Sequence, residues 1–225
     1  MRTPFGHFHP SLTRWGMGVL LVALTGGASA AVLYEQSPQD DGPGYFANAN
    51  TPQQMADDFT LGSAASLDGI TWWGSDNGSD AFVVRLFNGI GGTGTLLQAF
   101  NSPVVTQTGT ALTDEAQNPV FRYDFSLGSA FSLAAGTYYL SVQTDSQGLS
   151  DWSWLQGVSS NGDFWTRGED TDNWVSPTDG QGQALRGDLA FRLNGIPAQI
   201  PEPGILGLLM LAGAGLALAR RRNPG

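Results

Sequence analysis

The sequence has no cysteine and no lysine, and its only two histidines are His7 and His9. Without cysteine the chain has no disulfide, no thiol nucleophile and no thiolate metal site. Without lysine it has no Schiff-base amine. If the segment holding both histidines is removed, Ser-His-Asp catalysis and histidine-ligated zinc are excluded as well. The chemistry that remains uses carboxylates, amides, hydroxyls, aromatic rings and bound Ca²⁺.

Positive charge is also scarce, since all ten basic residues are arginine and half of them lie near the two ends. Between residues 31 and 200, five arginines stand against nineteen acidic residues, which gives this part of the chain a net charge of −14. An electrostatic field of that sign repels nucleic acid and anionic lipid and attracts cations such as Ca²⁺. The composition therefore excludes nucleic acid as a partner.

The N-terminal residues 1–30 have the pattern of a secretory signal peptide. Arg2 and Arg14 precede the apolar stretch "GMGVLLVALTGG", which is followed by "ASAA". This order of a basic region, a short apolar region and a small-x-small site predicts cleavage after Ala30, with Ala28 and Ala30 as the small residues. The alternatives are an uncleaved membrane anchor and a buried core helix. The prediction makes the Sec machinery a transient partner and the protein an exported one.

The other end carries a candidate transmembrane segment, because residues 204–219 contain no charge. As a helix this segment is about 24 Å long, slightly shorter than the hydrocarbon core of about 30 Å. Pro201 and Pro203 cannot lie inside a helix, so the span begins after them. Arg220, Arg221 and Arg222 follow it and place that end in the cytoplasm, which predicts an intermediate in the inner membrane.

The order Pro201-Glu202-Pro203, apolar helix and terminal arginine cluster resembles the PEP-CTERM sorting signal of Gram-negative bacteria, here residues 201–225. The resemblance implies recognition by exosortase, an integral-membrane transpeptidase that cuts near the Pro-Glu-Pro motif. It also implies release to the cell surface, the outer membrane or the extracellular polymer. A plain C-terminal anchor is the alternative. Residues 196–200 are expected to be a short linker before the signal.

The body, residues 31–195, is predicted to be all-β, a single jelly-roll-like antiparallel β-sandwich. Short runs of alternating apolar and polar residues are separated by turn residues, at a spacing typical of such folds. Asn77-Gly78 predicts a tight hairpin turn between two of these runs. The expected strands are 31–36, 55–61, 67–74, 81–88, 95–100, 120–127, 136–145, 151–157, 163–168 and 188–195.

Two acidic loops are candidate Ca²⁺ sites, since carboxylate and amide oxygens are the ligands that this ion prefers. The first loop holds Asp76, Asn77 and Asp80 around a glycine, and the second is described by the run "RGEDTDNW". The first lacks the spacing of an EF-hand and also fits a simple hairpin turn. Acidic residues in loops are also typical of a solvated surface. The candidate ligands of the second loop are Glu169, Asp170 and Asp172.

Tryptophans concentrate between residues 151 and 174, where Trp152, Trp154, Trp165 and Trp174 stand among Asp, Asn and Gln. Exposed rings in such surroundings stack on the C–H faces of sugars, while the polar side chains bind the hydroxyl groups. The alternative interpretation is that these rings fill the core.

Taken together, these patterns predict an exported, exosortase-processed surface or matrix protein, associated with exopolysaccharide or biofilm, that is not an enzyme and acts by binding or as structure, with carbohydrate as the candidate ligand. One alternative is a glycoside hydrolase that uses two carboxylates from among Asp151, Asp163 and Glu169. Another is a structural matrix component without a small ligand. Apart from Ca²⁺, no cofactor is expected.

Overall fold

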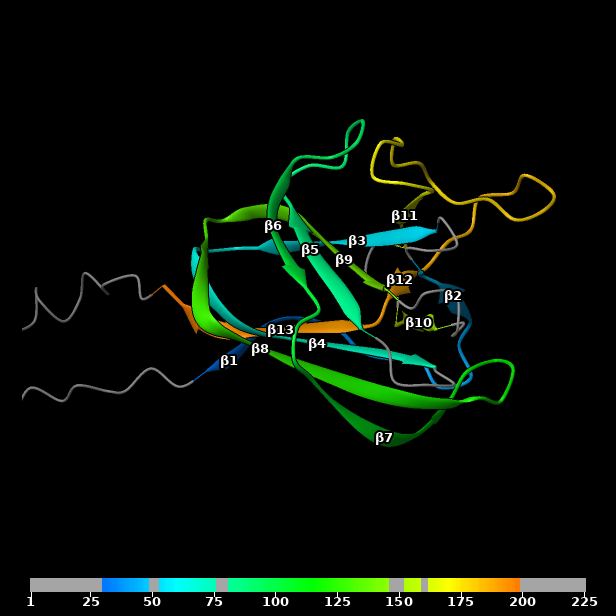
Figure 1. Cartoon of the computed structure of the whole chain (residues 1–225), viewed down its shortest axis with the longest axis horizontal. Coiled ribbons are helices and arrows are strands. Elements are labelled where there is room, and N and C mark those ends of the chain that lie inside the picture. Colours follow the sequence, from blue (N-terminus) through cyan, green and yellow to red (C-terminus); the bar gives the residue numbers. More distant parts are fainter. Residues whose placement is uncertain (1–29, 49–52, 76–80, 146–151, 159–161, 199–225) are drawn as a thin grey trace, which may run out of the picture.

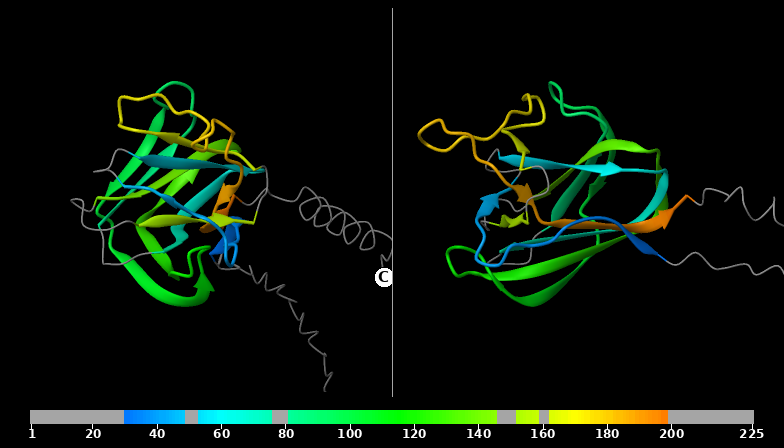
Figure 2. Two further views of the ribbon diagram at one scale, coloured as in Figure 1. Left: turned by 90° about the vertical axis from the view of Figure 1, so that its right-hand side faces the viewer. Right: turned by 180° about the vertical axis from the view of Figure 1, so that it is seen from behind.

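The computed structural model describes residues 30–48, 53–75, 81–145, 152–158 and 162–198. These residues form two antiparallel β-sheets packed face to face, visible as separate layers in Figures 1 and 2. No helix occurs in the described residues, and therefore none there that is long and apolar enough to cross a membrane. The predicted all-β sandwich is confirmed. The candidate signal peptide and the candidate helix 204–219 lie outside the described residues.

The first sheet contains eight strands and the second contains five. In the first sheet β13 lies between β1 and β4, and β4 also pairs with β8, which pairs with β7 at the edge. The strands of the first sheet are β1 (Ala31–Gln36), β2 (Gly44–Phe46), β4 (Ala65–Ser75), β7 (Val105–Thr113), β8 (Pro119–Leu133), β10 (Ser153–Gly157), β12 (Asp188–Leu189) and β13 (Phe191–Pro197). The second sheet has the order β11 (Phe164–Arg167), β3 (Gln54–Leu61), β9 (Gly136–Thr144), β5 (Phe82–Phe87) and β6 (Leu96–Asn101).

Most strands begin and end within two residues of the predicted limits, but β8 runs six residues further than predicted, to Leu133. Three other differences have physical reasons. The edge strand β7 is polar and largely exposed, so it lacks the apolar alternation that identifies a half-buried strand. The short strand β2 has only three residues, too few for any period to show. The predicted strand 188–195 divides at Ala190, whose backbone N–H donates to Leu155 O at 2.8 Å.

The predicted hairpin at Asn77-Gly78 is wrong. The strand before it, β4, pairs with β8, β10 and β13 in the first sheet, whereas β5 pairs with β6 and β9 in the second. The chain therefore passes from one sheet to the other between these strands. Turn residues mark where a chain reverses, but the partner of each strand is decided by which faces become buried.

The core between the sheets is dominated by aromatic rings, and Phe82 lies at its centre. Phe82 comes from β5 in the second sheet, and its ring makes edge contacts with Trp72, Tyr123 and Trp152. The ring centroids are 4.9 to 5.3 Å apart. Edge-to-face packing at this distance adds to the hydrophobic gain from burial. Phe82 thus joins the two sheets through one side chain.

The C-terminal strand of the sandwich continues further than the sequence indicates. β13 pairs with β4 as far as Pro197, and Ala198 N donates to Ala64 O at 2.7 Å. Residues 196 and 197, expected in the linker, therefore belong to the sheet. At the same end Ala31 of β1 pairs with Gly195, so the first and last strands of the sandwich lie side by side (Figure 1).

Replacing Phe82 by alanine is expected to lower the free energy of unfolding by about 3–5 kcal/mol, because it removes a buried ring that contacts three aromatic side chains of the opposite layer. Phe46→Ala is the matched control, since Phe46 is 49% exposed and its loss should cost about 0.5 kcal/mol or less. Denaturant unfolding monitored by tryptophan fluorescence measures both. Equal destabilisation by the two changes would contradict the central role of Phe82.

Candidate functional site

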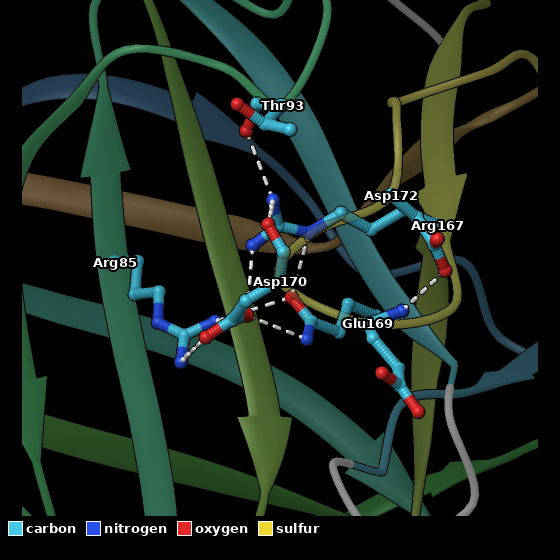
Figure 3. A network of polar contacts seen from close by, with 7 residues as sticks. Arg85, Thr93, Arg167, Glu169, Asp170 and Asp172 are labelled. Atoms are coloured by element: carbon cyan, nitrogen blue, oxygen red, sulfur yellow. Dashed lines mark hydrogen bonds and ion pairs between the residues drawn. The ribbon is translucent and has the colours of Figure 1, made fainter.

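Two loops, residues 88–95 and 168–175, lie over the outer face of the second sheet and are held there by a polar network (Figure 3). Arg85 on β5 binds Asp170 with both ends of its guanidinium, Nη1 to Oδ1 at 2.7 Å and Nη2 to Oδ2 at 3.1 Å. Gln54 on β3 donates to the same Oδ1 at 2.8 Å. Two strands of the sheet, β3 and β5, thus hold the side chain of Asp170 through hydrogen bonds.

Arg167 on β11 is the buried member of this network, with only 3% of its side chain exposed. It donates to Gln54 Oε1 at 2.8 Å, to Thr93 O at 2.9 Å and to Asp170 Oδ1 at 3.0 Å. Its guanidinium also lies 4.3 Å from the ring centroid of Trp174. A buried guanidinium is stable only when it is paired and its donors are satisfied, and these contacts meet that requirement.

The pKa values in the network follow from this packing. Burial pushes the pKa of Asp170 upward, but the hydrogen bond from Gln54 and the charges of Arg85 and Arg167 outweigh it and lower the pKa. Burial lowers the pKa of Arg167, and the charge of Asp170 opposes this effect. Asp170 is therefore a carboxylate whose negative charge is already balanced by two arginines.

This arrangement corrects the expected Ca²⁺ site at Glu169, Asp170 and Asp172. Asp170 faces arginines, and Asp172 Oδ2 accepts from the backbone N–H of Glu169 at 2.8 Å, which closes the loop on itself. Within the described ranges, no three acidic or histidine side chains converge as a metal site would require. The other candidate ligands, Asp76, Asn77 and Asp80, lie outside the described residues, and a Ca²⁺ ion there stays a prediction.

The four tryptophans of the predicted sugar site do not form one surface. Trp152 and Trp154 are fully buried between the sheets, so the core interpretation holds for both and neither can stack on a sugar. Trp174 is 6% exposed and stacks against the guanidinium of Arg167. Trp165 is half-buried on the outer face and makes an edge contact with Tyr139 at 5.1 Å. Alternation along one strand predicts a common face, but it cannot tell which face is inward.

The carboxylates proposed for a hydrolase are also dispersed. Asp163 is paired with Arg186 at 2.6 Å on the surface, Glu169 is exposed in its loop, and Asp151 lies outside the described residues. The structure instead brings together Asp57 of β3 and Asp188 of β12, which the sequence reasoning missed. Both are fully buried, so they do not flank an accessible sugar cleft as hydrolysis requires.

Asp57 joins the two sheets. Its carboxylate accepts hydrogen bonds from the backbone N–H groups of Leu189, in the first sheet, and Asp58. Burial raises its pKa well above the usual value, the hydrogen bond from Leu189 opposes that change, and the nearby charge of Asp188 supports it. One signal in the sequence could have identified Asp57 as a buried residue. Side chains alternate between the two faces of a strand, so Asp57 lies on the same inward face of β3 as Met55 and Phe59.

The described body is thus an all-β sandwich, and a segment of different character follows its last strand directly. A family model described as the PEP-CTERM protein-sorting motif matches residues 199–222. Neither a curated protein nor a solved structure matches the chain. The chain therefore carries a PEP-CTERM sorting motif, as its Pro-Glu-Pro and arginine residues predict. This motif implies export, with exosortase as the processing partner, and membrane-associated sorting toward the cell surface.

The raised pKa of Asp57 predicts a pH dependence of stability. The folded state binds this proton more tightly than the unfolded chain does, so the free energy of unfolding should fall as the pH rises above about 4, the usual pKa of aspartate. The described body has no histidine to obscure the trend. Melting temperatures across neutral and mildly acidic pH measure it.

Asp57→Asn should flatten this dependence, because asparagine has no proton to lose. Asp68→Asn on β4 is the matched control and should keep the slope of the parent protein. A slope that persists unchanged in Asp57→Asn would show that another group is responsible.

Proposed function

We propose that this is a non-catalytic protein of the cell surface or extracellular matrix, and that its β-sandwich is the part displayed there. The observation that carries the proposal is the direct succession of sandwich and sorting motif. β13 ends at Pro197 and the matched motif begins at residue 199, so the sandwich is the domain that directly precedes the motif. Delivery proceeds through an inner-membrane intermediate, exosortase cleavage near Pro201-Glu202-Pro203, and transfer to the outer membrane or the extracellular polymer.

The use of the charged residues supports a binding or structural role. Arg85, Arg167 and Asp170 hold two loops on the sheet, while Arg192 pairs with Glu35 across β13 and β1 at 2.8 Å. These contacts stiffen a scaffold and leave the named groups no role in proton transfer. A secreted carboxylate-dependent hydrolase would instead need two carboxylates facing a common cleft.

Polysaccharide is a candidate partner of the displayed sandwich, and the pair Trp165–Tyr139 favours it. Both rings are partly exposed on the outer face of the second sheet, and Asp58 lies opposite Tyr139 in the register of β3 and β9. Further along the same strands, the hydroxyl groups of Thr60 and Thr137 lie 2.9 Å apart on the surface. Aromatic rings beside a carboxylate and hydroxyl groups suit a neutral sugar chain, because the acidic body repels anionic ones.

Replacing Pro201, Glu202 and Pro203 together by alanine tests delivery. Exosortase should no longer process the protein, and cell fractionation should find an unprocessed form in the membrane. A variant with Gln181→Ala, at an exposed position outside the motif, is the control and should be processed like the parent protein. Unchanged release and mass of the triple variant would contradict the proposal.

Trp165→Ala tests polysaccharide binding. Loss of one stacking contact is expected to weaken binding to a neutral polysaccharide about tenfold, measured by affinity electrophoresis across a panel of such polymers. Phe46→Ala removes a more exposed ring, from the first sheet, and should leave binding unchanged. If no polymer retards the parent protein, or if Trp165→Ala binds equally well, polysaccharide is not the partner and the display proposal still stands.

A further inference from the structure

The edge strand β6 lies in an uncharged part of a strongly acidic body. No residue between Arg85 and Asp114 carries a charge, and this stretch contains both β6, the edge of the second sheet, and β7, the edge of the first. Phe100 of β6 packs against Phe125 of β8, next to β7, so the two uncharged edges lie on the same side of the sandwich. That side is where another acidic molecule can approach with the least repulsion.

The backbone of β6 is open toward this side. Val83 pairs with Asn101 in the register of β5 and β6, and Ser102 N donates to Phe82 O at 2.9 Å. Because hydrogen-bonded pairs alternate in an antiparallel ladder, the N–H and C=O groups of Ala99 and Asn101 point away from β5. Ala99 O accepts only a flexible side-chain amide, from Gln98 Nε2 at 2.9 Å, among the described residues. An incoming strand can displace that amide without loss of a hydrogen bond.

The other sheet edges are better protected against pairing. β1 carries Glu35, which is paired with Arg192, and its register shifts between Val32 and Tyr34. The outer side of β11 is bridged to Val175 through Thr166. β7 contains Gly109, where its pairing with β8 also shifts register. Charges, irregular register and covering segments are the features by which sheets avoid edge pairing. β6 also shifts register, at its start near Leu96 and Leu97, but from Gln98 to Asn101 it pairs regularly with β5 and carries no charge. The two leucines at its start are exposed.

We infer that β6 is a self-association surface, at which a second copy of this chain adds its own β6 antiparallel to the first. This goes beyond the proposed function and does not depend on sugar binding. A two-fold axis at Ala99 places this residue opposite Ala99 of the second copy and pairs the outward backbone groups of both strands. The two sheets then form one continuous sheet across the dimer.

The choice of a second copy follows from charge. A cationic partner would bind the acidic faces of the body and would gain no attraction from the uncharged strand β6. Another acidic sandwich is repelled by those faces, so it can approach most easily at β6. Identical copies also meet at high local concentration when one sorting motif delivers them all to the same surface. The two bodies carry charge of the same sign, and salt screens the repulsion between them. Raising the salt concentration should for this reason strengthen the association.

The absence of cysteine allows a direct test by single-cysteine cross-linking in the full chain. Facing Cα atoms in a hydrogen-bonded antiparallel pair lie about 5.5 Å apart, within the range of a disulfide. Ala99→Cys should give a disulfide-linked dimer on non-reducing gels of oxidised cells, at least tenfold faster than Val32→Cys. Val32, 54% exposed on the opposite edge strand β1, is the matched control.

A second variant separates strand pairing from simple contact between surfaces. Ala99→Pro removes an outward N–H that β5 does not use, so the monomer should keep its melting temperature while its dimerisation, measured by sedimentation, weakens at least tenfold. Three results would overturn the inference. Ala99→Cys and Val32→Cys could cross-link equally fast, or the purified protein could stay monomeric at all protein and salt concentrations. The third is a dimer that persists in Ala99→Pro. A different protein captured by Ala99→Cys in place of a second copy would overturn it as well.

Discussion

The contact between Phe82 and the aromatic rings of the opposite sheet is the constraint on which the rest of the molecule depends. β4 and β5 belong to different sheets, and Trp72 and Phe82 from these two strands meet in the core at 5.1 Å. Without a disulfide, the sheets are held together by burial and by hydrogen bonds such as the one from Leu189 to Asp57. A sheet that shifted would open this aromatic cluster, so the stacking limits how the two sheets can lie on each other.

The outer face of the second sheet shows what this scaffold makes possible. With β3, β5 and β11 fixed, Gln54, Arg85 and Arg167 converge on one carboxylate, Asp170. The network uses charges to position loops, in a protein with few positive groups to spare. Arg167 also stacks on Trp174, and both side chains are buried, whereas Trp165 and Tyr139 of the same sheet stay partly exposed.

The sorting motif and the fold fit together at β13. This strand lies between β1 and β4, and its last residues remain hydrogen-bonded in the sheet, two residues before the motif begins. Because β13 has a partner strand on each side, the residues just before the motif are fixed in the sheet. The negative charge of the body repels anionic polymers. The edge strand β6 carries no charge, so this repulsion is weakest there.

The sequence by itself determined the all-β class, most strand positions and the sorting motif, because these depend on local periodicity and on the order of Pro201, Glu202, Pro203 and the terminal arginines. Only the tertiary structure decided what faces what. Trp152 and Trp154 share a face in any strand, but packing against Phe82 and Phe191 made it the inner one. Asp170 is an acidic loop residue in the sequence and the partner of two arginines in the fold, because Arg85 and Arg167 come from strands that only the sheet brings together.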